Sequence, residues 1–216
     1  MLRSVHVGAK LVLPSVEEGV WRLFSYLSSK GKALYNDVPM QVVGRVGRIE
    51  VGLFVGPRYA LLSVRCSGCG CEEVAEEFQR VVGVIGASLE LIRAEASEEL
   101  GADAVRCSSA LEELGIKLVR EVRIAPNDMP LEVIHGGVRI PGVGEVAVVI
   151  SGYAGAELYR LSVAVTSPPR FSPRLLAREA CNILSELRKL LKESECSKRA
   201  EALQRAKDLG LHDRHR

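Results

Sequence analysis

Three cysteines crowded into residues 66–71 give this 216-residue chain its most distinctive chemical feature. Cys66, Cys69 and Cys71 occupy a predicted turn from a strand into a helix, and a helix N-terminus stabilises thiolate. A disulfide within this cluster, or from it to Cys107, is the favoured interpretation, because intracellular proteins of hyperthermophiles can be rich in disulfides. We therefore expect a structural disulfide that involves at least one of the three clustered cysteines, without a metal.

Two other roles for these thiols are less favoured alternatives. A zinc site needs a fourth ligand, such as Cys107 or His6, but C-x2-C-x-C is not a standard structural zinc spacing. A redox or nucleophilic thiol needs an activating base, and no histidine neighbours the cluster in sequence. Buried, unreactive thiols are the remaining alternative.

The sequence carries no other catalytic motif of these kinds. The sequence has no phosphate-binding loop, no G-x-S-x-G and no H-E-x-x-H, and its histidines stand at positions 6, 135, 212 and 215. His135-Gly136-Gly137 is predicted in a loop or strand end beside Arg139, where a glycine pair is typical of a turn. We predict no catalytic residue, no cofactor and no metal ligand, and an enzyme is the less favoured class.

Composition indicates a thermophilic, archaeal-like source and a cytoplasmic location. The chain has 21 Arg against 8 Lys, only 6 Asn and Gln together, and a single Thr, and scarcity of thermolabile amides suits a hot source. No apolar run approaches the roughly 18 to 20 residues that span a bilayer, so no membrane association is expected. The N-terminus also lacks the pattern of a signal peptide.

The net charge of +2 conceals a segregation of charge along the chain. Residues 1–65 carry 9 basic and 4 acidic side chains, whereas residues 66–115 carry 3 and 11. This pattern predicts either simple solvation of outer faces or a basic strand surface opposite an acidic helix. Under the second interpretation the strands carry a candidate nucleic-acid surface, although the pI of 8.2 is low for such a domain. Its residues are Arg45, Arg48, Arg58, Arg65 and Arg139.

Hydrophobic periodicity predicts strand, helix, three strands and helix over residues 1–100. Alternating residues 5–13 indicate a strand, and residues 15–31 indicate a helix that begins at a capping box and ends at glycine. A connector with one short strand (41–46) leads to a hairpin (48–55 and 59–66) and a helix from Cys71. That helix either continues to Leu89 or ends near Gly86, with a strand over residues 88–93, and the pattern does not decide between the two.

Residues 47–85 and 144–191 share a hairpin, a following helix and an LSV segment, which predicts an internal duplication. Residues 116–124 then repeat the first strand, residues 101–115 connect the copies with short helix, and turn residues 126–130 replace the first helix. The predicted organisation is therefore a first repeat (1–100), a connector (101–115), a second repeat (116–192), and a C-terminal helix with a disordered tail (193–216).

In its order of elements the first copy resembles a unit of the tandem TATA-binding-protein fold and, more loosely, small RNase P protein subunits. The phenylalanine pairs with which the former kinks DNA have no counterpart here, so no functional residue is carried over and no family is assigned. The predicted class is α+β, with an antiparallel sheet built from two degenerate repeats and helices packed on one face.

The favoured function is a non-enzymatic binding or scaffold module for nucleic acid or a protein partner. The alternative is a small-molecule or enzymatic domain with a sheet–helix pocket near the Cys66–Cys71 turn. A homodimer through the C-terminal helices is the expected oligomer.

Overall fold

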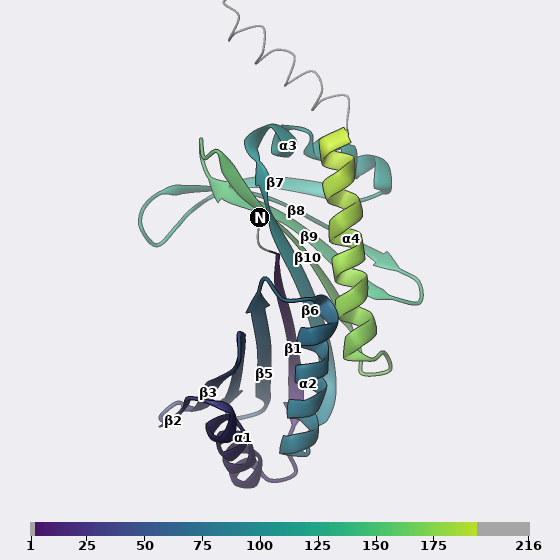
Figure 1. The fold of residues 1–216 in the computed structure, drawn as a ribbon. Helices are drawn as coiled ribbons and strands as arrows, with labels where there is room; N and C mark the ends of the chain where they lie inside the picture. Colours follow the sequence, from purple (N-terminus) through teal and green to yellow (C-terminus); the bar gives the residue numbers. More distant parts are fainter. Residues whose placement is uncertain (1–2, 194–216) are drawn as a thin grey trace, which may run out of the picture.

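The computed structural model describes residues 3–193, and these form one ten-stranded sheet with helices (Figure 1). The first half of the chain contains β1 (Ser4–Val12), α1 (Val16–Lys30), β2 (Ala33–Asp37), β3 (Met40–Val46), β4 (Ile49–Val55), β5 (Ala60–Ser67) and α2 (Cys71–Ile85). The second half contains β6 (Ser88–Gly101), α3 (Ala102–Arg106), the 3-10 helix η1 (Ser108–Leu114), β7 (Lys117–Ile124), β8 (Pro130–Ile140), β9 (Gly144–Tyr153), β10 (Leu158–Ser167) and α4 (Pro173–Glu193).

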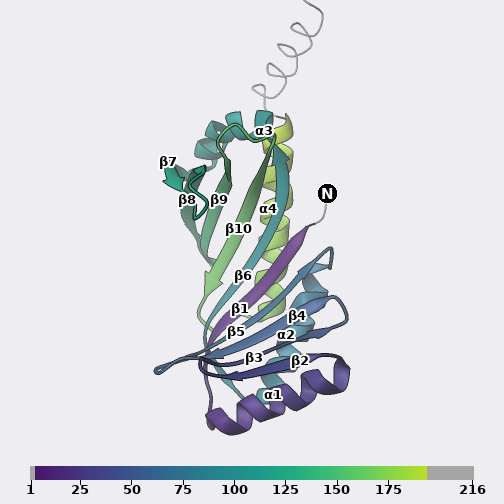
Figure 2. The same ribbon diagram turned by 90° about the vertical axis from the view of Figure 1, so that its left-hand side faces the viewer.

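The strands lie in the order β2-β3-β4-β5-β1-β6-β10-β9-β8-β7, and every neighbouring pair is antiparallel. The predicted α+β class with an antiparallel sheet is therefore confirmed. The central pair is β1 with β6, while β2 and β7 form the two edges. The sheet is strongly twisted, so that β2 and β3 run across the view of Figure 2 while β6 and β10 rise through it. Such twist follows from the right-handed twist of each strand.

Alternation along each strand places one set of side chains in the core. In β1, Val5, Val7 and Leu11 are buried, and His6 and Lys10 point to the opposite side. Ser15 is the N-cap of α1, and its hydroxyl accepts a hydrogen bond from the Glu18 N–H, as the capping box predicts.

Each long helix contacts a different part of the sheet. Helix α1 contacts β2 and β3, α2 contacts β1 and β5, and α4 lies along β6 and β10 (Figure 1). Neighbouring helices also contact one another, α1 with α2 and α2 with α4. Within residues 3–193, no helix has both the length and the apolar character that crossing a membrane requires.

Buried charges tie these helices to each other and to the sheet. Glu77 of α2 is 3% exposed and accepts a hydrogen bond of 2.7 Å from the Tyr26 hydroxyl of α1. Burial and this hydrogen bond raise the pKa of Tyr26. Glu77 is buried because α1 packs over that part of α2.

Glu98 of β6 is the second buried acid. Its carboxylate lies 2.8 Å from the Arg3 guanidinium and 2.7 Å from the Arg188 guanidinium of α4. Arg3 also donates a hydrogen bond to Ser185, one turn of helix before Arg188. This cluster joins the start of the chain, the central strand β6 and the last described helix.

Several predicted boundaries need correction. Helix α2 ends at Ile85, because Gly86 adopts the left-handed conformation (φ 66°) that stops a helix. The strand alternative after it is the right one, although β6 extends far beyond residue 93, to Gly101. The connector predicted to hold one short strand (41–46) contains two strands, β2 and β3. Of the predicted strand 116–124, residues 117–124 form an edge strand, β7, which does not occupy the central position of β1 that the predicted correspondence requires.

His135, Gly136 and Gly137 lie inside β8, not in a loop or at a strand end. A β-carbon on Gly136 would approach the Lys117 carbonyl oxygen of β7 to 2.5 Å. Glycine is therefore required there by a close approach of two backbones. Of the predicted C-terminal helix and tail (193–216), residues 194–216 lie outside the described residues.

Candidate binding site

One face of β3, β4 and β5 carries the candidate site. In β5, Leu62 and Val64 are buried, whereas Leu61, Ser63 and Arg65 point to the opposite side. Pairing with β4 brings Glu50 opposite Arg65. We call this side the exposed face.

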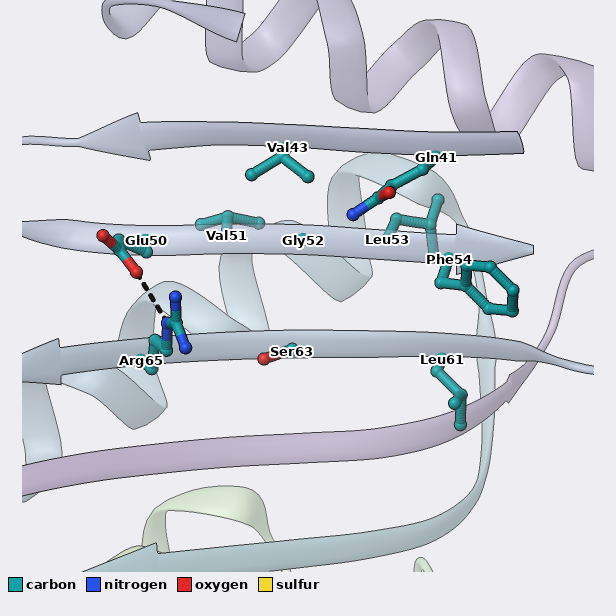
Figure 3. Close-up of a pocket in the computed structure, with 10 residues that line it drawn as sticks. All are labelled: Gln41, Val43, Glu50, Val51, Gly52, Leu53, Phe54, Leu61, Ser63 and Arg65. Carbon is teal, nitrogen blue, oxygen red and sulfur yellow. Dashed lines mark hydrogen bonds and ion pairs between the residues drawn. The ribbon is translucent and has the colours of Figure 1, made fainter. Parts of the chain in front are cut away.

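An apolar hollow of about 330 Å³ lies on the exposed face, at Gly52. A β-carbon on Gly52 would meet no atom within 4 Å, so the glycine opens space at the middle of β4. Figure 3 shows Phe54, Leu61 and Gln41 gathered toward one end of the hollow. The ion pair between Glu50 and Arg65 marks the other end (Figure 3).

A larger polar hollow of about 740 Å³ lies beyond that ion pair. It shares Glu50 and Arg65 with the apolar hollow, so the two are contiguous. Four arginines line it, together with three serines and three glutamates: Arg45, Arg48, Arg65, Arg160, Ser4, Ser67, Ser97, Glu50, Glu98 and Glu99.

Strand order explains how distant residues converge here. β1 pairs with β5 on one side and with β6 on the other, which sets Ser4 opposite both Ser67 and Ser97. β10 pairs with β6 and brings Arg160 opposite Glu99. The polar hollow therefore draws on both halves of the chain.

The four arginines differ in their partners. Arg65 Nε lies 2.6 Å from a Glu50 oxygen, and Arg45 pairs with the other oxygen of the same carboxylate. Hydrogen bonds from Arg65 and Arg45 lower the pKa of Glu50, so it stays ionised at neutral pH. Within residues 3–193, Arg48 and Arg160 make no ion pair.

The hollow consequently has a positive balance. Glu98 is already bound by Arg3 and Arg188, which leaves Glu50 and Glu99 against four arginines. Arginine forks and hydroxyl groups together suit an oxyanion such as phosphate or carboxylate.

A histidine and a serine meet beside the apolar hollow. His6 Nε2 lies 2.9 Å from Ser63 Oγ, and Ser63 lines the hollow. Burial is the largest influence on His6 and lowers the pKa of its imidazole, with Glu95 acting in the opposite direction. Sequence reasoning missed this pair because 57 residues separate its members and no local pattern links them.

The predicted arginine surface is only partly assembled. Arg45, Arg48 and Arg65 come together in the polar hollow. Arg58 precedes β5, at the opposite end of that strand from Arg65. Arg139 lies in β8, opposite Glu145, in the other half of the sheet.

The cysteine cluster forms two disulfides. Cys66 is bonded to Cys69, with 5.7 Å between their Cα atoms, and Cys71 is bonded to Cys181 of α4. Cys107 belongs to neither bond; its buried thiol lies 3.4 Å from the Asp103 carbonyl oxygen. Cys66 also lines the polar hollow, but its sulfur is engaged in the disulfide.

Comparison with known proteins adds no family. No protein-family model matches the chain, and no curated protein matches it. Among solved structures, it is similar to the di-domain ARO/CYC StfQ from the steffimycin biosynthetic pathway, with 12% sequence identity over 91% of this chain and 99% of that one. The TM-score is 0.24, so this likeness carries no argument about fold or function.

Proposed function

We propose that this protein is a non-enzymatic binding module that presents the exposed face of its sheet to nucleic acid. The polar hollow carries the proposal, because it concentrates four arginines of which Arg48 and Arg160 have no anionic partner within residues 3–193. Phosphate oxygens are the natural complement of such a site, and arginine contacts them with two parallel hydrogen bonds.

The arrangement of helices supports this use of the sheet. We propose that α1, α2 and α4 share one side of the sheet, as their mutual contacts suggest, and that the exposed face is left for a partner. Simple solvation of this face does not require arginines of β3, β5 and β10 to converge on one hollow. Their convergence therefore favours a bound partner. An acidic protein segment is the rival partner.

We also propose that the chain is a tandem duplication whose halves meet at β1 and β6. Each half has a strand, a helical segment, four strands and a long helix, and the strand order outward from the centre is the same in both. In this alignment β6 corresponds to β1, and α3 with η1 corresponds to α1. The polar hollow then lies beside the junction of the repeats.

Salt-dependent binding of labelled oligonucleotides tests the function. Anisotropy titrations with single- and double-stranded DNA and RNA should show affinity that falls as salt rises, because bound phosphates release counterions. Replacing both Arg48 and Arg160 by Gln should reduce the slope of log K against log salt by about 1.4 for a single strand. The double variant Arg58→Gln and Arg139→Gln is the control, since it removes the same charge outside the hollow.

If no nucleic acid binds even at low salt, the proposal is wrong. Binding of an acidic peptide in its place would identify the rival partner. An equal loss in both double variants would mean that the whole face, and not the hollow, attracts the polymer.

A second candidate function is favoured by one observation, the hydrogen bond between His6 and Ser63. A serine beside a neutral histidine is the beginning of a nucleophilic site, and the apolar hollow offers room for an acyl group. The strands on both sides of Ser63 use its neighbouring backbone amides in the sheet, so no oxyanion donor is supplied from there. Hydrolysis of activated esters that Ser63→Ala abolishes would establish this candidate.

A further inference from the structure

We infer that the site selects single-stranded over double-stranded nucleic acid, with an unpaired base in the apolar hollow and backbone phosphates in the polar hollow. This inference rests on the proposed function and names its preferred partner.

The two hollows form one track along the strands. Both are lined by Glu50 and Arg65, and the apolar hollow continues along the same strands to Phe54 and Leu61. Phe54 lies four positions after Glu50 along β4, which corresponds to roughly 13 Å. A nucleic-acid strand whose phosphates contact the arginines therefore reaches the apolar hollow within a few nucleotides.

The apolar hollow has the chemistry that a nucleobase needs. Phe54 is 38% exposed and Leu61 is 42% exposed, so their apolar surface is not used for folding. An aromatic ring beside a basic track is the usual combination in proteins that bind single strands, because every base has a stacking face. Gln41 and Ser63 border the same hollow and offer polar groups to the edge of a base.

Only an unpaired base can use this hollow. In a duplex the bases are stacked inside the helix, and a base must be unstacked and unpaired before it can enter a protein pocket. Duplex DNA can therefore contact the arginines with its phosphates, but stacking on Phe54 adds nothing to its affinity. The apolar hollow should raise affinity for single strands alone.

Two variants of the 216-residue chain test this selectivity. Phe54→Ala removes the stacking ring, and we expect affinity for a single-stranded oligonucleotide to fall about tenfold while duplex affinity is unchanged. Gly52→Val fills the hollow from the middle of β4, where no atom lies within 4 Å of the new β-carbon. It should lower single-strand affinity in the same way. Tyr153→Ala is the matched control, because Tyr153 is an exposed aromatic residue on β9, distant in the strand order.

The outcomes distinguish the inference from the function on which it rests. Equal affinity for single and double strands, or equal losses for both in Phe54→Ala, would overturn the inference and leave nucleic-acid binding intact. No binding to any oligonucleotide would overturn both. If Tyr153→Ala weakens single-strand binding as much as Phe54→Ala does, the base site is elsewhere on the sheet and the inference is wrong.

Discussion

Cys71, the first residue of α2, is bonded to Cys181 of α4, and 110 residues separate them in sequence. The two helices belong to different halves of the chain. Arg174 of α4 and Glu72 of α2 form an ion pair of 2.7 Å close to this bond. The disulfide therefore joins the halves through α2 and α4, while β1 and β6 join them through the sheet.

The two disulfides should contribute very different amounts to stability. By the loop-entropy relation, a bond that closes 110 residues contributes about 4.8 kcal/mol and one that closes three about 1.6 kcal/mol. The double variant Cys71→Ala and Cys181→Ala should therefore lose much more unfolding free energy in urea than Cys66→Ala and Cys69→Ala. Similar losses would contradict the assigned pairing, as would titration of more than two thiols in the denatured, unreduced protein.

Neutralising Glu98 should destabilise the fold. Glu98 is 6% exposed and is shared by Arg3 and Arg188, so Glu98→Gln leaves two partly buried guanidinium groups without their anion. We expect a loss of about 3 kcal/mol in unfolding free energy. Glu99→Gln, at the adjacent exposed position, should change it by less than about 0.5 kcal/mol. Equal losses of unfolding free energy in Glu98→Gln and Glu99→Gln would show that the buried ion pairs of Glu98 do not stabilise the fold specifically.

His6 should make stability fall in mild acid. Burial lowers its pKa in the folded protein below the usual 6.5, so between these two values the unfolded chain binds a proton that the folded chain does not. Stability from this group is complete above pH 6.5 and declines as pH falls toward the lower, folded-state pKa. His6→Gln should flatten that decline in urea titrations between about pH 7 and 5. His135→Gln is the control, and an NMR titration of the His6 ring measures the pKa directly.

Gly136 should not tolerate even alanine. Its new β-carbon would stand 2.5 Å from the Lys117 carbonyl oxygen, which is backbone and cannot turn away. We expect Gly136→Ala to destabilise the protein by about 2 kcal/mol and to increase hydrogen exchange in β7. Gly52→Ala meets no atom within 4 Å and is the matched control. Unchanged exchange in β7 would contradict the close approach.

Local sequence patterns predict those helices and strands whose formation depends on interactions between residues close in sequence. The capping box at Ser15 and the alternation of Val5, Val7 and Leu11 correctly predict the first helix and strand. The length of β6 could not be predicted from the local sequence pattern. Ile92, Ala94 and Ala96 alternate, but the following residues Ser97 and Glu98 have the polarity of a helix start, and only pairing with both β1 and β10 keeps them extended.

The candidate site was predictable only in part. Arg45, Arg48 and Arg65 belong to one hairpin region, so sequence reasoning could group them. Arg160 joins them only because β10 pairs with β6, a contact that no spacing in the sequence encodes. The apolar hollow was missed for a similar reason, since it depends on Gly52 lying beside side chains of two neighbouring strands.

The pairing of β1 with β6 has a consequence for synthesis on the ribosome. A nascent chain that has emerged through Ile85 already contains β5, the other neighbour of β1, but not β6. At that stage β1 is the open edge of a five-stranded sheet, with unpaired N–H and C=O groups that can recruit a foreign strand. Translation of residues 88–101 supplies the missing neighbour, so the interval before they emerge is when nascent chains of this protein are most exposed to aggregation.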